Sequence, residues 1–190
     1  NALKLLNSRG EFLSGEDGEA ILHMARANDY SYADVKNLGT IKPLEGMDVK
    51  HIDQVLKLDL VKPELIKKKK FRVAIDCVNS VGGIILPQLL GSLGAEEVIE
   101  LYCEPTGDFP HNPEPLPEHL TEISKVMLQE KADVGFVVDP DVDRLAIVCE
   151  DGSMFGEEYT LVAVADYILS MTPGNTASNL SSTRALRDVT

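Results

Sequence analysis

Between residues 71 and 172 the sequence alternates strand-length apolar segments with longer segments of helical periodicity, and this alternation restricts the possible fold more than any other feature. The strand-like segments cover residues 71–76, 97–102, 134–138 and 145–149, and the helical ones cover 82–93, 117–127 and 157–171. Residues 134–138 are apolar without interruption, which is typical of a strand covered on both faces. The sequence therefore predicts an α/β domain in which a layered mixed sheet has helices on both faces.

Connection lengths refine this prediction. Only six residues, 139–144, separate the third strand from the fourth, whereas a parallel crossover needs a dozen or more. We therefore expect the fourth strand to return antiparallel beside the third. Residues 104–117 hold five of the ten prolines, which do not suit a central strand, so this segment is expected to be a loop.

The flanking regions differ in character. Residues 1–70 are expected to be helical, with apolar positions recurring at Ile21, Leu22 and Ala25 and again between Ile52 and Leu60. We interpret the lysine run at 67–70 as a solvated face before a strand. The predicted domains are residues 1–70, a helical C-terminal remnant of a first domain, then 71–172, the α/β domain, and 173–190, the start of a third.

Both ends of the sequence indicate a piece of a longer chain. Asn1 is not a start methionine, and residues 2–6 already have the pattern of a helix interior. Residues 183–190 stop inside another helix-like pattern. We therefore expect further domains of the same chain on both sides.

Composition excludes several classes of protein. The net charge of −13 argues against a nucleic-acid-binding surface, which needs clustered lysine and arginine. Three widely spaced cysteines, Cys77, Cys103 and Cys149, indicate reduced thiols in a cytoplasmic protein rather than disulfides or a zinc site. No apolar stretch approaches the length of about 18 residues that a membrane span requires, and no signal peptide is present, so no membrane partner is expected.

The candidate chemistry lies directly after the third predicted strand, in Asp139-Pro140-Asp141-Val142-Asp143-Arg144. Three aspartates at i, i+2 and i+4 converge if the chain turns there, and a cation would offset the repulsion between their carboxylates. Ligand sets made only of oxygen favour Mg²⁺ or a similar hard ion. Arg144 offers a fork of donors suited to a phosphate.

Three other interpretations compete. Asp139, Asp141, Asp143 and Glu150 occupy the spacing of an EF-hand calcium loop, although Arg144 takes its glycine position and apolar strands flank it. A haloacid-dehalogenase-like phosphatase also places aspartates at a strand end, but its chemistry needs a downstream lysine, and the sequence has none after Lys131. The third interpretation is a solvated acidic turn that binds nothing.

Some other conspicuous residues have plainer explanations. Gly82-Gly83 before a helix is more often a turn than a phosphate cradle. His111 and His119 are expected to be surface or loop-packing residues rather than metal ligands. Glu157 and Glu158 are expected to open a helix, where their charges favour the helix dipole.

The segments around the three aspartates resemble those of a known protein family. Residues 132–138 leading into Asp139–Arg144 resemble the metal loop of the α-D-phosphohexomutases, the family of phosphoglucomutase and phosphomannomutase. Three further segments are similar to the second domain of that family in the same order. They are Arg72–Asp76 with 79–83, Glu104-Pro105-Thr106-Gly107-Asp108-Phe109 with Asn112-Pro113-Glu114-Pro115, and Asp151-Gly152 with Gly156-Glu157-Glu158.

This resemblance implies a phosphoserine isomerase that moves a phosphate between C1 and C6 of a hexose through a bisphosphorylated intermediate. Asp139, Asp141 and Asp143 would hold Mg²⁺, and Arg144 would be a catalytic residue that steadies the phosphoryl group. The phosphoserine motif of the family, Thr-Ala-Ser-His-Asn-Pro, is not in the sequence, and neither is its sugar-selecting Gly-Glu-x-Ser-Gly-His loop. We therefore expect the 190 residues alone to be inactive, and the resemblance leaves the hexose phosphate unidentified.

Overall fold

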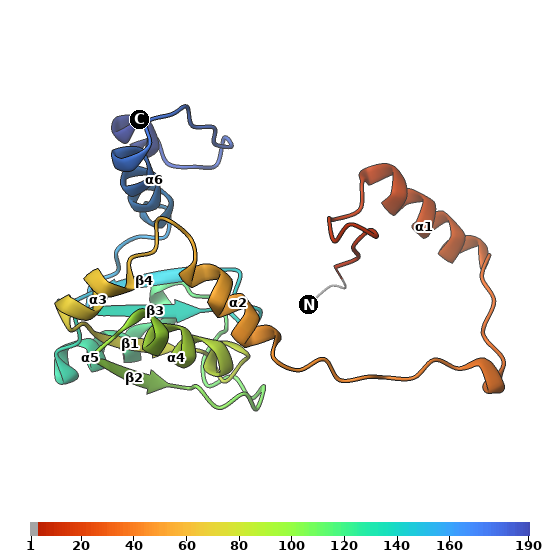
Figure 1. Cartoon of the computed structure of the whole chain (residues 1–190), viewed down its shortest axis with the longest axis horizontal. Coiled ribbons are helices and arrows are strands. Elements are labelled where there is room, and N and C mark those ends of the chain that lie inside the picture. The colour runs from red at the N-terminus through yellow and green to blue at the C-terminus, as the bar shows by residue number, and fades with distance from the viewer. Residues whose placement is uncertain (1–3) are drawn as a thin grey trace. The chain divides into compact units, whose positions relative to one another are not determined.

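The computed structural model describes residues 4–190, which divide into two units after Leu44 (Figure 1). In the first unit, α1 (Gly15–Ala27) begins where the Ser14 hydroxyl accepts the N–H of Asp17, and it ends at Asn28 in the left-handed conformation. Leu6 forms a β-bridge with Phe12, so the expected helix at residues 2–6 is wrong from residue 4 onward, and residues 2 and 3 lie outside the described chain. Most of residues 28–46 are also non-helical, and their large apolar side chains, among them Val35, Leu38 and Ile41, are exposed.

The second unit opens with α2 (Met47–Leu56) and α3 (Pro63–Lys69), which both contact α4 (Gly82–Leu93). Pro63 occupies the first turn of α3, where a missing N–H costs nothing, and Lys70 ends the helix in the left-handed conformation. The four lysines at 67–70 are exposed, as expected of a solvated face. The division into three domains at residues 70 and 172 stays a prediction.

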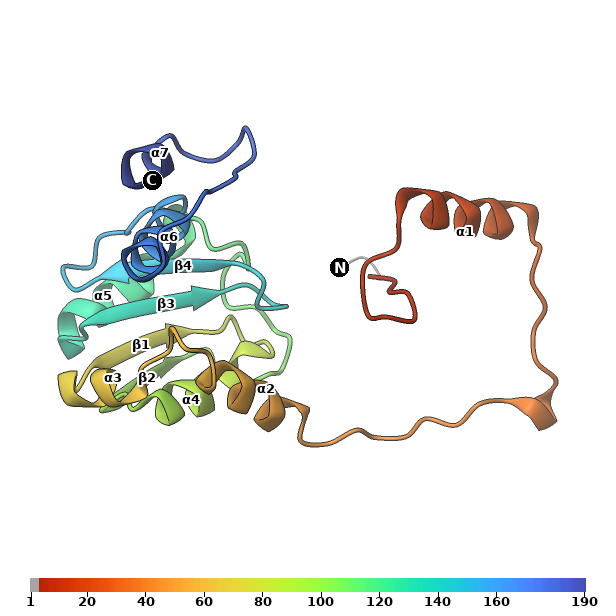
Figure 2. The same cartoon turned by 45° about the horizontal axis from the view of Figure 1, so that its top comes forward.

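The sheet has four strands in the order β2-β1-β3-β4. These strands are β1 (Arg72–Asp76), β2 (Glu97–Leu101), β3 (Val134–Val138) and β4 (Leu145–Cys149). Both β2 and β3 run parallel to β1, and β4 runs antiparallel to β3 (Figure 2). This arrangement confirms the predicted mixed sheet and the antiparallel return of the fourth strand.

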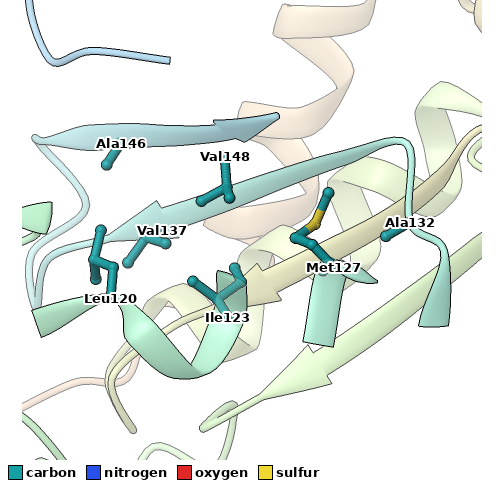
Figure 3. Packing of buried hydrophobic residues seen from close by; sticks show 8 residues of the cluster. Leu120, Ile123, Met127, Ala132, Val137, Ala146 and Val148 are labelled. Atoms are coloured by element: carbon teal, nitrogen blue, oxygen red, sulfur yellow. The ribbon is translucent and has the colours of Figure 1, made fainter. Parts of the chain in front are cut away.

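Helices cover both faces of the sheet, as the uninterrupted apolar strand predicted. One face packs against α5 (Thr121–Glu130), and its buried side chains include Ala74, Ile123, Met127, Val137 and Val148 (Figure 3). The other face packs against α4 through Val73, Ile75, Leu90 and Val138. Neighbouring residues of one strand thus belong to the hydrophobic cores on opposite faces of the sheet, because successive side chains of a strand point to opposite faces.

Two helix boundaries differ from the sequence prediction. The helix expected from Pro117 begins at Thr121, since Pro117–His119 form a separate 3₁₀ turn. The helix expected from Glu157 is α6 (Tyr159–Met171), and it begins two residues later. The chain ends in α7 (Ala185–Val189). Among the described residues, every helix is too short or too polar to cross a membrane.

Candidate metal centre

The connection between β3 and β4, residues 139–144, is called the aspartate loop below. Asp139 directly follows β3 and is only 3% exposed. Its Oδ1 accepts the N–H groups of Asp143 and Arg144 at 3.1 and 3.2 Å, and its carbonyl oxygen accepts the N–H of Val142 at 3.1 Å. Val142 takes a positive φ of 60°, which is unusual for a β-branched residue. The loop therefore folds back around the Asp139 side chain.

This turn brings the three predicted aspartates together. One carboxylate oxygen from each of Asp139, Asp141 and Asp143 lies within 4.8 Å of the other two. Asp139 is buried, and the other two are exposed. Hard oxygen donors that open to solvent on one side suit Mg²⁺, which keeps part of its coordination shell for water or phosphate. The donor set fits the ion that the sequence suggested.

The electrostatics of the cluster favour a cation as well. Burial raises the pKa of Asp139, the N–H of Arg144 opposes this rise, and the charges of Asp143 and Asp141 add to it. The charged form of Asp139 is therefore costly when the cluster stands alone. A divalent ion would reverse that balance, because it is attracted to the ionised carboxylates.

Arg144 lies on the edge of this cluster. Its Nε is 3.5 Å from Asp139 Oδ2 and 4.0 Å from Asp143 Oδ1, while its Nη1 donates to Glu114 Oε1 at 2.8 Å. One guanidinium thus contacts three carboxylates. Sequence reasoning gave Glu114 no role, because it lies 30 residues away in the proline-rich loop, residues 104–117.

A second buried aspartate lies on the neighbouring strand. Asp76 ends β1 and is 1% exposed. Its Oδ1 accepts the N–H of Val78 at 3.0 Å, and its Oδ2 lies 2.9 Å from Nε2 of His111. Burial raises the pKa of Asp76, while the Val78 N–H and His111 oppose the rise.

His111 is thus a loop-packing residue rather than a ligand of the aspartate cluster, as the sequence indicated. Its partner Asp76 was missed. The available signal was that Asp76 ends an apolar strand in the same way as Asp139 does.

The remaining candidates stay outside the cluster. Gly82 and Gly83 begin α4, where a Cβ on Gly83 would lie 1.9 Å from the carbonyl oxygen of Cys103. Close packing against Cys103 therefore explains Gly83, and both glycines lie in the first turn of the helix rather than in a separate turn before it. Glu157 and Glu158 lie exposed just before α6, and His119 Nε2 is 3.8 Å from Glu118 Oε1.

The flanking elements decide against an EF-hand. An EF-hand calcium loop joins two helices, whereas the aspartate loop joins the antiparallel strands β3 and β4. Glu150, which would be its last ligand, follows β4 and is exposed.

Comparison with protein families agrees with this geometry. The model for the α/β/α domain II of phosphoglucomutase/phosphomannomutase matches residues 49–152, which include all four strands and the aspartate loop. The chain belongs to the phosphoglucomutase/phosphomannomutase family. This membership confirms the resemblance drawn from the sequence and leaves the haloacid-dehalogenase-like alternative without support.

Individual relatives are longer proteins. The chain is 33% identical over 167 residues to a phosphomannomutase/phosphoglucomutase of Pseudomonas putida, a match that covers 87% of this chain and 34% of that protein. It is 33% identical over 180 residues to a phosphoglucomutase of Neisseria gonorrhoeae, covering 93% and 37% respectively. The chain therefore spans about a third of the length of these curated relatives.

Solved structures show the same fold. A phosphoglucomutase/phosphomannomutase family protein of Burkholderia thailandensis matches with a TM-score of 0.72 at 24% identity, covering 95% of this chain and 38% of that one. The match to a putative phosphomannomutase of Thermus thermophilus has a TM-score of 0.71 at 19% identity and covers 94% and 40%. The mixed sheet with its helices is thus the fold of these proteins.

Proposed function

We propose that this chain is the metal-binding part of a Mg²⁺-dependent phosphohexomutase, which moves a phosphate between C1 and C6 of a hexose phosphate. The observation that carries the proposal is the convergence of Asp139, Asp141 and Asp143 beside Arg144, in a chain of the phosphoglucomutase/phosphomannomutase family. Since the chain spans about a third of its relatives, the substrate and the remaining catalytic groups would come from a longer protein.

The aspartates and Arg144 have separate tasks in this proposal. Asp139, Asp141 and Asp143 would hold the ion, which supplies charge neutralisation to phosphate oxygens when bound. Arg144 binds and orients the phosphoryl group through its guanidinium, whose five N–H donors exceed the two that contact Glu114 and Asp139. The burial of Asp139 anchors the loop so that both tasks occur at one place.

Metal titration tests the proposal. At constant ionic strength, calorimetry of the 190-residue chain should show weak Mg²⁺ binding, because few protein oxygens complete the site. This binding should be lost in Asp141→Asn. Glu150→Gln is the matched control and should leave binding unchanged. Tight selectivity for Ca²⁺, or Mg²⁺ binding that survives Asp141→Asn, would overturn the proposed metal site.

The chain alone should not catalyse the reaction. Its sequence has no Thr-Ala-Ser-His-Asn-Pro stretch, so the phosphoserine that the family resemblance implies as phosphate donor is not provided by these residues. Incubation with glucose 1-phosphate or mannose 1-phosphate should yield no 6-phosphate. Measurable conversion would contradict this part of the proposal.

The choice of hexose stays open in this proposal. Relatives include proteins named phosphomannomutase, phosphoglucomutase and, at 29% identity in Methanopyrus kandleri, probable phosphoglucosamine mutase. The cytoplasmic location expected from the three cysteines stays a prediction.

A further inference from the structure

A continuous series of polar contacts joins the two buried aspartates at the ends of β1 and β3. From Asp76 the first contact is His111, whose Nδ1 lies 2.8 Å from the carbonyl oxygen of Asn112. The side chain of Asn112 then accepts the N–H of Glu114 at 3.0 Å. Glu114 accepts from Arg144, whose Nε faces Asp139.

The first part of this series is firmly held. Asp76 is buried and fixed by the Val78 N–H, and His111 also packs edge-on against Tyr102 with ring centroids 5.8 Å apart. Prolines on both sides of Glu114, Pro113 and Pro115, fix the backbone φ of this part of the loop. The proline-rich loop is therefore stiff close to Glu114.

The His111 contacts also require a proton. A carbonyl oxygen can only accept, so Nδ1 of His111 carries a hydrogen. The contact between Nε2 and Asp76 then holds another proton, either on the imidazole or on the carboxyl. With the proton on the imidazole the bond joins two opposite charges, and with the proton on the carboxyl the O–H donates to the ring nitrogen, so a hydrogen bond holds His111 in either form.

We propose that Glu114 is a positioning residue that holds the Arg144 guanidinium beside the aspartate loop, and that His111, bound to Asp76, fixes the segment that carries Glu114. The inference rests on the proposed role of Arg144 in binding phosphate. An arginine side chain loses considerable rotamer freedom when it is ordered. Because Glu114 orders Arg144 in advance, less of that freedom remains to be lost when a phosphate binds.

The order of the Arg144 side chain tests this directly. In the ¹⁵N-labelled chain, the heteronuclear NOE of the Arg144 Nε–H group should indicate an ordered side chain. Glu114→Ala should lower this NOE to the range of the exposed Arg187, and Glu114→Gln should restore most of it, because an amide oxygen still accepts from Nη1. An Arg144 that stays ordered in Glu114→Ala would overturn the inference.

The proposed role of His111 in fixing the Glu114 segment is tested by substitutions in the proline-rich loop. His111→Ala should lower the Arg144 NOE as well, and Asn112→Ala serves as a milder variant that keeps the contact between Asp76 and His111. His119→Ala is the matched control and should change nothing. If neither His111→Ala nor Asn112→Ala affects Arg144, the support of Glu114 by His111 is wrong.

Inorganic phosphate separates this inference from the proposed function. With Mg²⁺ present, phosphate should shift the Arg144 Nε–H signal, and Glu114→Ala should weaken phosphate binding about two- to fivefold, as expected for an exposed ion pair. Tighter binding in Glu114→Ala would show that Glu114 competes with phosphate and would overturn the inference. If phosphate never shifts Arg144 while its order depends on Glu114, the proposed function fails and the positioning stands.

Discussion

Asp76 and Asp139 lie at the carboxyl ends of the neighbouring parallel strands β1 and β3, yet their surroundings differ. Both are almost fully buried, and both use Oδ1 to accept N–H groups from the turn that follows. The second oxygen of Asp76 meets His111, whereas the second oxygen of Asp139 faces Arg144 at the longer distance of 3.5 Å, next to further carboxylates.

The difference suits one strand-end aspartate to a structural contact and the other to the proposed metal site. Both oxygens of Asp76 have partners within the protein, the Val78 N–H and the His111 ring, so this side chain fixes a loop. Asp139 belongs to a group with more negative than positive charge, and such a group is stabilised by a cation from outside. Four experiments test this contrast.

The largest expected effect is on stability. Asp76→Ala should lower the free energy of unfolding by about 3 kcal/mol, because it leaves His111 without its buried partner. Without divalent ions, Asp139→Ala should cost only about 1 kcal/mol, since removing its charge also relieves repulsion from Asp141 and Asp143. Urea denaturation of both variants measures the difference, and equal losses would contradict the contrast.

Metal binding should depend on only one of the two aspartates. Asp139→Asn should weaken Mg²⁺ binding about tenfold or more, which corresponds to about 1.4 kcal/mol. Asp76→Asn should change it less than about twofold. Isothermal titration calorimetry gives both values, and a comparable loss in Asp76→Asn would mean that the two sites act as one.

The pH dependence of stability sharpens the contrast at Asp76. The pKa of Asp76 is raised in the folded protein, so folding favours the protonated carboxyl. The resulting contribution to the free energy of unfolding is fully present below the unfolded pKa of about 3.9. It is lost as the pH rises through the folded pKa. The unfolding free energy of the wild type, relative to the non-titrating Asp76→Asn, should therefore fall with rising pH by at most about 1.4 kcal/mol per unit. If the stability of the wild type relative to Asp76→Asn rises with pH instead, the raised pKa of Asp76 is contradicted.

The smallest effect concerns Tyr102, which packs against His111. Its hydroxyl donates to Glu122 Oε2 at 2.5 Å, and this bond raises the pKa of Tyr102 to about 12. Tyr102→Phe should cost about 1 kcal/mol at neutral pH. The stabilisation is present below pH 10 and should disappear as the pH rises through about 12. The same change at the half-exposed Tyr159 should cost less, and a pH-independent cost at Tyr102 would argue against the bond with Glu122.

Local sequence patterns predicted much of this molecule for identifiable reasons. The apolar run at residues 134–138 requires two covered faces, and the six-residue connection after it cannot form a parallel crossover. The clustering of Asp139, Asp141 and Asp143 followed from their spacing and a single turn. These properties depend on short stretches of chain.

The side-chain pairings that local patterns did not predict depend on contacts between distant residues. His111 and Asp76 are 35 residues apart, and Arg144 and Glu114 are 30 apart, so their pairing is set by the path of the proline-rich loop. Periodicity also misled at residues 4–6, where apolar residues form a β-bridge with Phe12 instead of a helix. Propensity alone rarely decides short segments that bury little surface.

The most direct test of the proposed metal centre uses Mn²⁺ as a paramagnetic substitute for Mg²⁺, since both ions prefer oxygen ligands. In the NMR spectrum of the 190-residue chain, substoichiometric Mn²⁺ should broaden the amide signals of residues 139–144 most strongly, and Asp141→Asn should remove this effect. The signals of Gly94 and Ala132, which precede β2 and β3 at the other end of the sheet, should stay sharp. Equal broadening at those two residues, or none within the aspartate loop, would contradict the account.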